Sequence, residues 1–347
     1  MKTNTFQVFS LATALMAVHT SALFVVKEGQ TAKAAAGYAK EWTVTKEASS
    51  DIVGAIDLSL AGTTFVSFDK SLPIGVLGKV KATSDQQNVV ETITVRNNPN
   101  HTNKPTNGAL NVTSVDGMNG GNLLTEITLS SNSLDVLIIS QSAQVVVEDG
   151  VLTNDLVIDV GGSSALYVSA SKANMDLKDL VLTASDSASV QIHAKSLSIG
   201  DVTMDVGGSA SVSVLAPTLK TSDIVVTAGD DGTICFSATD ASTGEVTIDD
   251  GSKVSFPKSS NKFGTTGKFQ CKMSPLPSRN VLSAQGSGST AAQITIAGSS
   301  DSSAVPLAGS NSGDSGAIAD ASSAATVLSP QSLHAVALCF FAFACLF

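Results

Sequence analysis

A repeat with a period of about 22 residues constrains the fold of this chain more than any other feature of its sequence. Six units can be aligned on an opening acidic residue, at Glu126, Asp155, Asp179, Asp201, Asp223 and Glu245. The spacings between successive acidic residues are 29, 24, 22, 22 and 22. Each unit is therefore one small supersecondary structure, which buries its apolar side chains only by stacking on its neighbours.

Apolar residues recur at fixed places inside each unit. When the acidic residue is counted as zero, positions one, three, eleven and thirteen are apolar in the first five units, and in the sixth after a two-residue deletion. In the first unit positions eleven and thirteen are Leu137 and Ile139. Apolar and polar residues alternate around these positions, which predicts short strands with one buried side. We expect Val212, for example, to face the core and Ser213 to face solvent.

The segments between the strands are rich in Gly, Ser and Asp, as at residues 161–163 and 207–209. These residues adopt the positive φ angles that tight turns need. Three short strands and three turns in about 22 residues form one coil of a parallel β-helix, or β-solenoid. An antiparallel sandwich also has alternating strands, but it does not explain why the same turn chemistry recurs at this fixed interval. We predict an all-β fold, a parallel β-solenoid with coils of about 22 residues.

Both ends of the chain are typical of targeting signals. Lys2 precedes an apolar run at residues 8–18 and small residues at 20–22, which predicts a cleaved secretory signal peptide. Residues 333–347 form an apolar tail without a basic flank, preceded by a polar spacer and small residues at 322–324. This pattern predicts a glycosylphosphatidylinositol (GPI) anchor attached at Ser322, with an uncleaved tail as the alternative. The protein would then lie on the outer face of the plasma membrane or in the cell wall.

These features divide the chain into six predicted parts. They are a signal peptide at 1–22, an N-terminal cap at 23–50, the solenoid at 51–256, a C-terminal cap at 257–281, a disordered stalk rich in Ser, Ala and Gly at 282–322, and a GPI-attachment propeptide at 323–347. We expect looser coils early in the solenoid, where Phe65 with Phe68, and Ile93 with Val95, supply the apolar residues.

Secretion exposes the chain to glycosylation and oxidation. Asn100 and Asn111 each begin an Asn-X-Thr sequon, and we favour Asn100 because its Pro- and Asn-rich surroundings predict an exposed loop. Cys235 and Cys271 are the two cysteines that remain after processing. We expect them to form a disulfide; the alternative is a buried Cys235 beside a free Cys271.

Composition argues against several functions. The net charge is −10, and Arg96 and Arg279 are the only arginines, so the chain lacks the clustered basic surface that nucleic-acid binding requires. After processing the histidines are His101 and His193, and no motif of a nucleophile with its base is present. We expect no catalytic residue, no cofactor and no metal, and therefore a protein that is not an enzyme.

The acidic residues that open the units leave two other functions open. Stacked coils would place them about 4.8 Å apart in an outward column. Such spacing is compatible with a polysaccharide-binding or polysaccharide-cleaving β-helix that works with surface carboxylates. Calcium could also relieve the repulsion between neighbouring carboxylates. Position four alternates between Asp and Thr along the units, which favours the third interpretation, a solvated face that limits like-charge repulsion.

The units over residues 124–256, such as DLVIDVGGSSALYV, resemble the head-GIN domain of autotransporter adhesins. The resemblance implies a β-solenoid with an adhesin-like role at the cell surface, and it brings no catalytic residues. Acidic residues at every unit start and a GPI-type tail depart from that pattern. Together these features predict a non-enzymatic surface adhesin or coat protein. Its expected partners are glycans or proteins of the cell surface or wall, with the membrane reached through the lipid anchor.

Overall fold

The computed structural model describes residues 24–35, 37–98, 107–114, 122–259, 263 and 266–279. The chain divides into two units, Met1–Gly288 and Ser289–Phe347, and every described residue belongs to the first. The predicted signal peptide, stalk and propeptide, with Ser322, lie outside the described residues, and so does Asn100. Within the described ranges no helix is long and apolar enough to cross a membrane.

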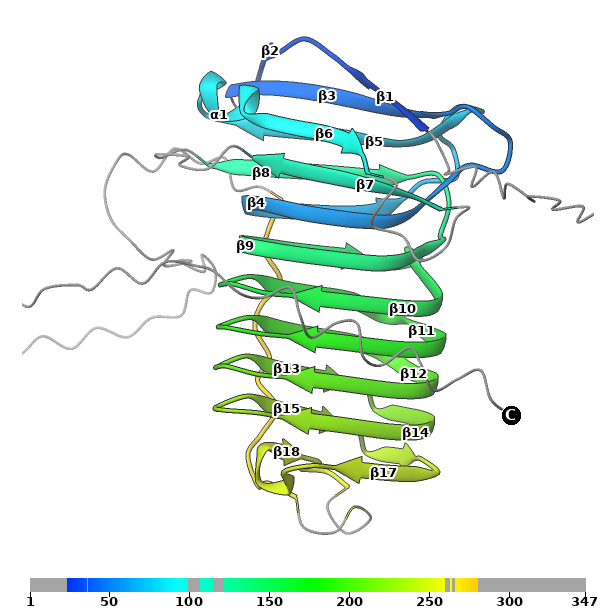
Figure 1. Cartoon of the computed structure of the whole chain (residues 1–347), viewed down its shortest axis with the longest axis vertical. Helices are drawn as coiled ribbons and strands as arrows, with labels where there is room; N and C mark the ends of the chain where they lie inside the picture. The colour runs from blue at the N-terminus through cyan, green and yellow to red at the C-terminus, as the bar shows by residue number, and fades with distance from the viewer. Residues whose placement is uncertain are drawn as a thin grey trace, which may run out of the picture. The chain divides into compact units, whose positions relative to one another are not determined.

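Regular coils form the second half of the solenoid (Figure 1). Their strands are β9 (Leu134–Glu148), β10 (Leu152–Val160), β11 (Ala165–Ala184), β12 (Ser189–Val206), β13 (Ser211–Leu215), β14 (Thr218–Ala228), β15 (Thr233–Ser237), β16 (Asp240–Ser242), β17 (Glu245–Ile248) and β18 (Val254–Ser255), with a 3₁₀ turn, η2, at Gly251–Lys253. Each strand pairs in parallel with its equivalent in the next coil, so that Asp179, Asp201 and Asp223 are direct neighbours. The predicted parallel β-solenoid, with coils of about 22 residues, is confirmed.

Each regular coil has three faces, because the long strands bend at corners. The first face contains residues 155–160, 179–184, 201–206, 223–228 and 245–248. The second face contains residues 165–169, 189–193, 211–215, 233–237 and 254–255. The third face contains residues 174–177, 196–199, 218–221 and 240–242.

Inward residues of the three faces meet in one continuous apolar core. Val202, Met204, Val212, Val214 and Leu219 of successive faces are all buried. Full burial of a side chain of this kind contributes about 1.5–3 kcal/mol. The last coil is closed by aromatic residues: Phe256 stacks on Phe236 with ring centroids 4.8 Å apart, and Phe263 lies 4.4 Å beyond it.

A column of left-handed residues forms the turn between the first and second faces. Gly162, Asp186, Gly208 and Asp230 have φ angles of 68°, 58°, 60° and 47°. The aspartates accept hydrogen bonds from the glycines of the preceding coil: Gly162 N–H donates to Asp186 Oδ2 at 3.0 Å, and Gly208 N–H to Asp230 Oδ2 at 3.3 Å. Glycine leaves room for the neighbouring backbone, and aspartate accepts the hydrogen bond of the glycine N–H beside it. The two residue types therefore alternate along the column.

The N-terminal part of the molecule is an antiparallel cap. It contains β1 (Phe24–Glu28), β2 (Ala32–Ala34), β3 (Gly37–Lys46), β5 (Val76–Ser84), α1 (Gln87–Glu91) and β6 (Ile93–Asn97). Strand β3 pairs with β1, β2 and β5, all antiparallel, and buries Trp42. The cap therefore includes β5 and β6, which the sequence analysis placed among the looser coils.

The first coils are also stacked out of sequence order (Figure 1). Strand β4 (Ile52–Phe68) pairs in parallel with β9 on one side, and with β7 (Asn107–Ser114) and β8 (Leu123–Leu129) on the other. Strands β5 and β6 in turn pair antiparallel with β8 and β7. After β4 the chain thus passes to the cap, returns to fill the space between cap and β4, and then continues beyond β4 as β9.

Two predicted registers in this region are wrong. Leu137 and Ile139 pair with Ile158 and Val160 of the first face, not with the second-face positions assigned to them. Phe65, expected to supply the core of an early coil, instead points outward and belongs to a second small cluster with Leu124 and Val146. The error at Leu137 and Ile139 arises because every strand alternates with the same period of two, so the pattern does not distinguish one face from another. Phe65 and Phe68 are three residues apart and therefore lie on opposite sides of their strand.

A C-terminal strap, residues 266–279, runs back along the second face, visible as the yellow trace beside the coils in Figure 1. Gly267 pairs with Ser255 in the last coil, and Arg279 reaches Glu126 of β8. The sequence predicts a C-terminal cap over 257–281, but from Gly267 onward these residues cover the side of the solenoid. Ser213, expected to face solvent, is only 6% exposed and lies in the column that the strap follows.

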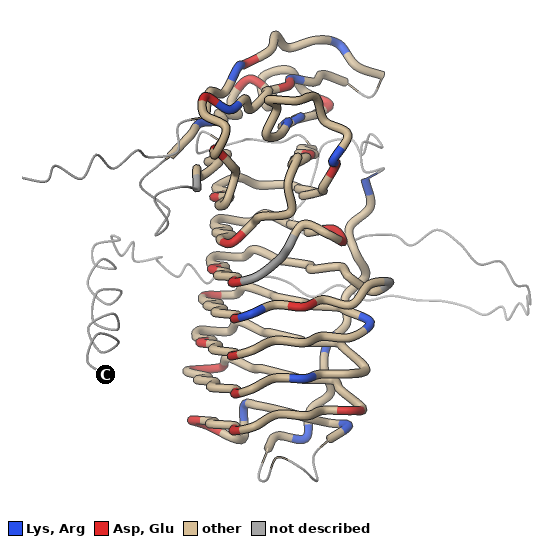
Figure 2. The backbone as a smooth tube through the Cα atoms, turned by 90° about the vertical axis from the view of Figure 1, so that its right-hand side faces the viewer, with Lys and Arg blue, Asp and Glu red and all other residues tan. Residues whose placement is uncertain are grey.

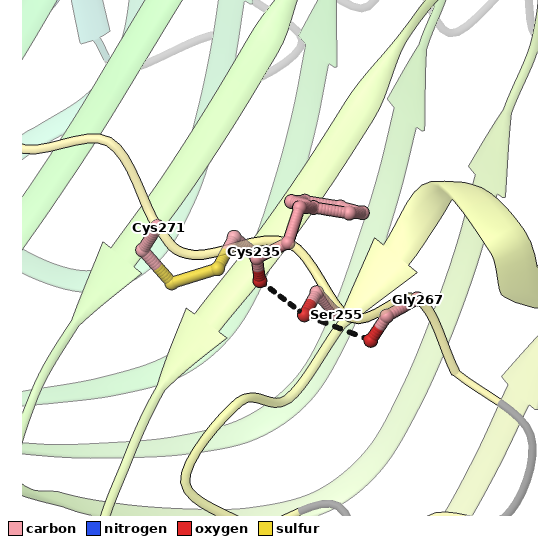
Figure 3. The surroundings of a disulfide bond; sticks show 5 residues. Cys235, Ser255, Gly267 and Cys271 are labelled. Atoms are coloured by element: carbon pink, nitrogen blue, oxygen red, sulfur yellow. Dashed lines mark hydrogen bonds between the residues drawn. A yellow bond between two sulfur atoms is a disulfide. The ribbon is translucent and has the colours of Figure 1, made fainter.

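Cys235 and Cys271 form a disulfide that attaches the strap to β15 (Figure 3). Their Cα atoms are 5.2 Å apart. Nearby, Ser255 Oγ donates to the carbonyl oxygens of Gly267 and Phe269 at 3.0 and 2.7 Å. Cys235 occupies the outward position twelve of its unit, which is why it reaches the strap and not the core.

Candidate functional site

The first face is a regular exposed surface of the coils. Its outward residues form three columns at unit positions zero, two and four, and the residues at positions two and four are exposed in all five units. Neighbouring coils are about 4.8 Å apart and alternate residues of one strand about 6.6 Å apart, so the side chains form a regular lattice. We call this lattice the open face.

An apolar column runs through the middle of the open face. It contains Val157, Val181, Thr203, Val225 and Thr247 in adjacent strands. The three valines are 40%, 42% and 44% exposed. Because these side chains are β-branched, they lose little rotamer freedom when a partner covers them.

The acidic column at position zero borders this apolar column. Asp179, Asp201, Asp223 and Glu245 are aligned in successive strands. Glu126, which the sequence analysis placed in the same column, instead pairs with Phe65 and lies on the second face. Figure 2 shows acidic residues recurring on successive coils.

Some of these carboxylates have structural partners. Asp201 N–H donates to Asp179 Oδ1 at 3.3 Å, and Glu245 N–H donates to Asp223 Oδ1 at 3.0 Å. Lys178 lies 3.3 Å from carboxylate oxygens of both Asp155 and Asp179. Its hydrogen bonds to Asp155 and then to Asp179 raise the pKa of the Lys178 ammonium. The column therefore also binds backbone amides at the corner where the first face begins.

The position-four column alternates as expected, with Asp159, Thr183, Asp205 and Thr227 in register. Asp159 is exposed, yet its strand neighbours are Ile138 and Thr183, and partial desolvation raises the pKa of its carboxyl. Threonine between aspartates places the position-four charges about 9.6 Å apart, two coil spacings, close to the screening length of about 8–10 Å at moderate salt.

The structure is similar to solved bacterial candidate adhesins. One from Bacteroides fragilis has 14% identity and a TM-score of 0.39, covering 66% of this chain and 97% of its own. One from Parabacteroides merdae has 11% identity and a TM-score of 0.37, covering 63% of this chain and 95% of its own. A third, from Parabacteroides distasonis, has 14% identity and a TM-score of 0.33, covering 61% and 94%. These solved structures are candidate adhesins, the class of protein that the repeat units resemble.

No protein-family model and no curated protein matches the sequence.

A small pocket lies away from the open face, beside the corner between the second and third faces. It has a volume of about 270 Å³ and is lined by Glu148, Asp149, Gly150, Val168, Ala170, Ala173, Asn174, Met175 and Asp176. Glu148 is already paired with Arg279 at 2.8 Å. Among the residues that the structure describes, no group of three or more His, Cys, Asp or Glu side chains is arranged to hold a metal ion.

Of the remaining candidate residues, Asn111 and His193 lie apart from the open face. Asn111 is half-buried in β7, and its Nδ2 donates to Asp57 Oδ2 at 2.9 Å, so the amide nitrogen that would carry a glycan is already engaged. Asn100 and His101 are outside the described residues. His193 is half-buried in β12, where its strand neighbours are Ser169 and Leu215.

Proposed function

We propose that this protein is a GPI-anchored, non-enzymatic adhesin of the cell surface or wall, and that the open face binds the partner. The observation that carries the proposal is a rigid lattice of exposed side chains. Its apolar column is bordered by carboxylates, and its spacing is set by the coil repeat. A preformed surface of this kind loses little conformational entropy on binding. The expected partners are glycans or proteins of a cell surface or wall.

The lipid anchor at Ser322 is supported by the uncharged terminal tail and the small residues before it. In a eukaryotic host, phosphatidylinositol-specific phospholipase C should release the protein from the cell surface. Deletion of residues 333–347 should send it to the medium. Mass spectrometry that recovers tail peptides from the mature surface protein would contradict the anchor.

Glycosylation is proposed at Asn100 in preference to Asn111, because Asn111 is half-buried and bonded to Asp57. Peptide mapping after glycosidase treatment should find the deamidated residue at Asn100. Efficient modification of Asn111 alone would contradict this preference.

Binding through the open face can be tested with matched charge substitutions. Val181→Glu with Val225→Glu adds two charges, two coils apart, to the apolar column, whereas Ser198→Glu with Ser242→Glu adds the same two charges, also two coils apart, to the third face. On a panel of glycans and cell surfaces, the first pair should reduce binding at least five-fold and the second pair should have little effect. Equal effects of the two pairs, or product release from a polysaccharide by the wild type, would count against a binding role for this face.

A further inference from the structure

The strap follows a continuous column of outward residues on the second face. Adjacent members of this column are direct neighbours in the strand registers: Ser255, Cys235, Ser213, Gln191, Tyr167, Val146, Phe65 and Glu126. Phe65 and Val146 are buried although they point away from the main core. We call the members from Gln191 to Glu126 the strap site.

The strap is attached to the strap site at its two ends. At one end, Ser274 N–H donates to Gln191 Oε1 at 2.8 Å, and Gln191 Nε2 donates to the Ser274 carbonyl at 3.4 Å. The Gln191 amide thus binds the backbone as another strand would, and it does so while 6% exposed. A buried amide needs such partners, and the strap supplies both of these hydrogen bonds.

At the other end, Arg279 is recognised by two carboxylates and an aromatic ring. Its Nη1 lies 3.1 Å from Glu126 Oε1 and its Nη2 lies 2.8 Å from Glu148 Oε2. The guanidinium also lies over the Phe65 ring, 4.7 Å from the centroid. Charge-assisted pairs and a cation–π contact together select arginine at this position.

The distance between the two attachments fits an extended proline segment. Ser274 is at the rung of Gln191 and Arg279 at the rung of Phe65, three rungs or about 14 Å away. The five residue steps between them span about 15 Å as a polyproline II helix. Pro275 and Pro277 favour that conformation. Docking of an extended proline-rich segment on a surface that contains aromatic residues, here Tyr167 and Phe65 of the strap site, is a recurring mode of peptide recognition.

Several side chains of the segment after the disulfide are exposed to solvent. Lys272, Met273, Pro275 and Leu276 are exposed, and Met273 is 71% exposed. Cys271 keeps the strap attached to β15 even when the residues beyond it detach. A tethered segment of this length has an effective concentration in the millimolar range, so a separate peptide must compete with it.

We infer that the strap site is a peptide-binding site, occupied here by residues 274–279 of the same chain. It would accept from a partner protein an extended segment with prolines and an arginine five residues after the residue bound by Gln191. The inference goes beyond the proposed adhesive role of the open face, because it concerns another face of the solenoid. It does not rest on the lipid anchor either, because it applies to the purified protein with or without the anchor.

The test uses the full chain purified in detergent and a fluorescent peptide with the sequence of residues 272–279. Ser274→Pro removes the N–H that binds Gln191, and Arg279→Glu places a carboxylate against Glu126 and Glu148, so this double variant releases the strap. Fluorescence anisotropy should show saturable binding to the double variant and at least ten-fold weaker binding to the wild type. Adding Glu126→Gln and Glu148→Gln to the double variant should weaken binding at least ten-fold.

The controls separate binding from unfolding. A peptide with glutamate in place of its arginine should not bind, and the disulfide and melting temperature of each variant are checked beforehand. If the double variant does not fold, the milder Arg279→Ala is used with the same peptides. The inference is overturned if the folded released variant does not bind the peptide, or if binding is unchanged by the two glutamine substitutions or by the glutamate peptide.

Discussion

Val225 and Val226 are adjacent residues of β14 with opposite environments. Val226 is in the core, whereas Val225 is 44% exposed on the open face. Val226→Asn should lower the free energy of unfolding by about 3 kcal/mol or more, because it buries an amide without partners and removes apolar contacts. Val225→Asn should cost less than about 1 kcal/mol. Urea unfolding of both variants measures the difference, and similar costs would mean that the register of this face is wrong.

Gly208 and its neighbour Gly207 form a second matched pair. Gly208 has a φ of +60°, and a Cβ there would lie 2.7 Å from the Asp186 carbonyl oxygen, whereas a Cβ at Gly207 would have no heavy atom within 4 Å. Gly208→Ala should therefore destabilise the protein by about 1–3 kcal/mol, and Gly207→Ala should change stability by less than about 1 kcal/mol. Thermal melts of both variants test whether the left-handed turn column is needed.

At the scale of elements, the acidic column joins strands through backbone amides as well as carrying charge. Asn keeps the oxygen that accepts these hydrogen bonds, so replacing Asp155, Asp179, Asp201 and Asp223 with Asn removes the repulsion together with the exposed ion pairs to Lys178, which contribute little. Melting temperature should stay level or rise, more so at low salt. Asp223→Ala should instead cost about 1 kcal/mol, because Glu245 N–H loses its acceptor.

Calcium binding by the same column would give a different result in melting experiments. If the carboxylates bind calcium, the wild type should gain about 2.7 kcal/mol at a hundred-fold excess over the dissociation constant, and the Asn variant should gain nothing. We expect no such difference, and a calcium-dependent melting shift confined to the wild type would replace the solvated-face interpretation.

Asp159 makes the stability of the first face depend on pH. Its pKa in the folded state is raised from 3.8 by desolvation, so the folded protein holds this proton more tightly than the unfolded chain. Stability from this group is therefore present at low pH and lost as the pH rises through its folded pKa. Asp159→Asn should raise the melting temperature at pH 7 and leave it nearly unchanged at pH 3. Asp205→Asn, at the equivalent position two coils away, is the control.

At the scale of the whole molecule, the disulfide keeps the strap against the coils. It closes a segment between residues 36 positions apart, and loss of such a crosslink costs about 3–4 kcal/mol by the loop-entropy relation. Replacing Cys235 and Cys271 with serine should lower the urea midpoint by a corresponding amount. Arg279→Ala, which removes only exposed ion pairs and the contact with Phe65, should cost about 1 kcal/mol. Equal costs would mean that the strap is held mainly by Arg279.

The regular coils could be predicted from sequence because each of their interactions repeats locally. Val202, Met204, Val212 and Val214 all lie where the repeat alignment places them, since inward positions must be apolar in every coil. The alternation of Asp and Thr at position four could also be predicted from the sequence, because residues that repeat at a fixed interval become neighbours once the strands are in register. The open face follows directly from that register.

What the sequence by itself determined is therefore the solenoid, its period and the inward or outward direction of side chains in the regular coils. The tertiary structure alone decided the insertion of β7 and β8 between the cap and β4, the separation of Glu126 from the acidic column, and the path of the strap. The physical reason is that these depend on contacts between distant segments, such as Arg279 with Glu126 and Phe65. A period of two tells which side chains are buried in a strand, but it carries no information about which strand lies beside it or which segment covers its outer face.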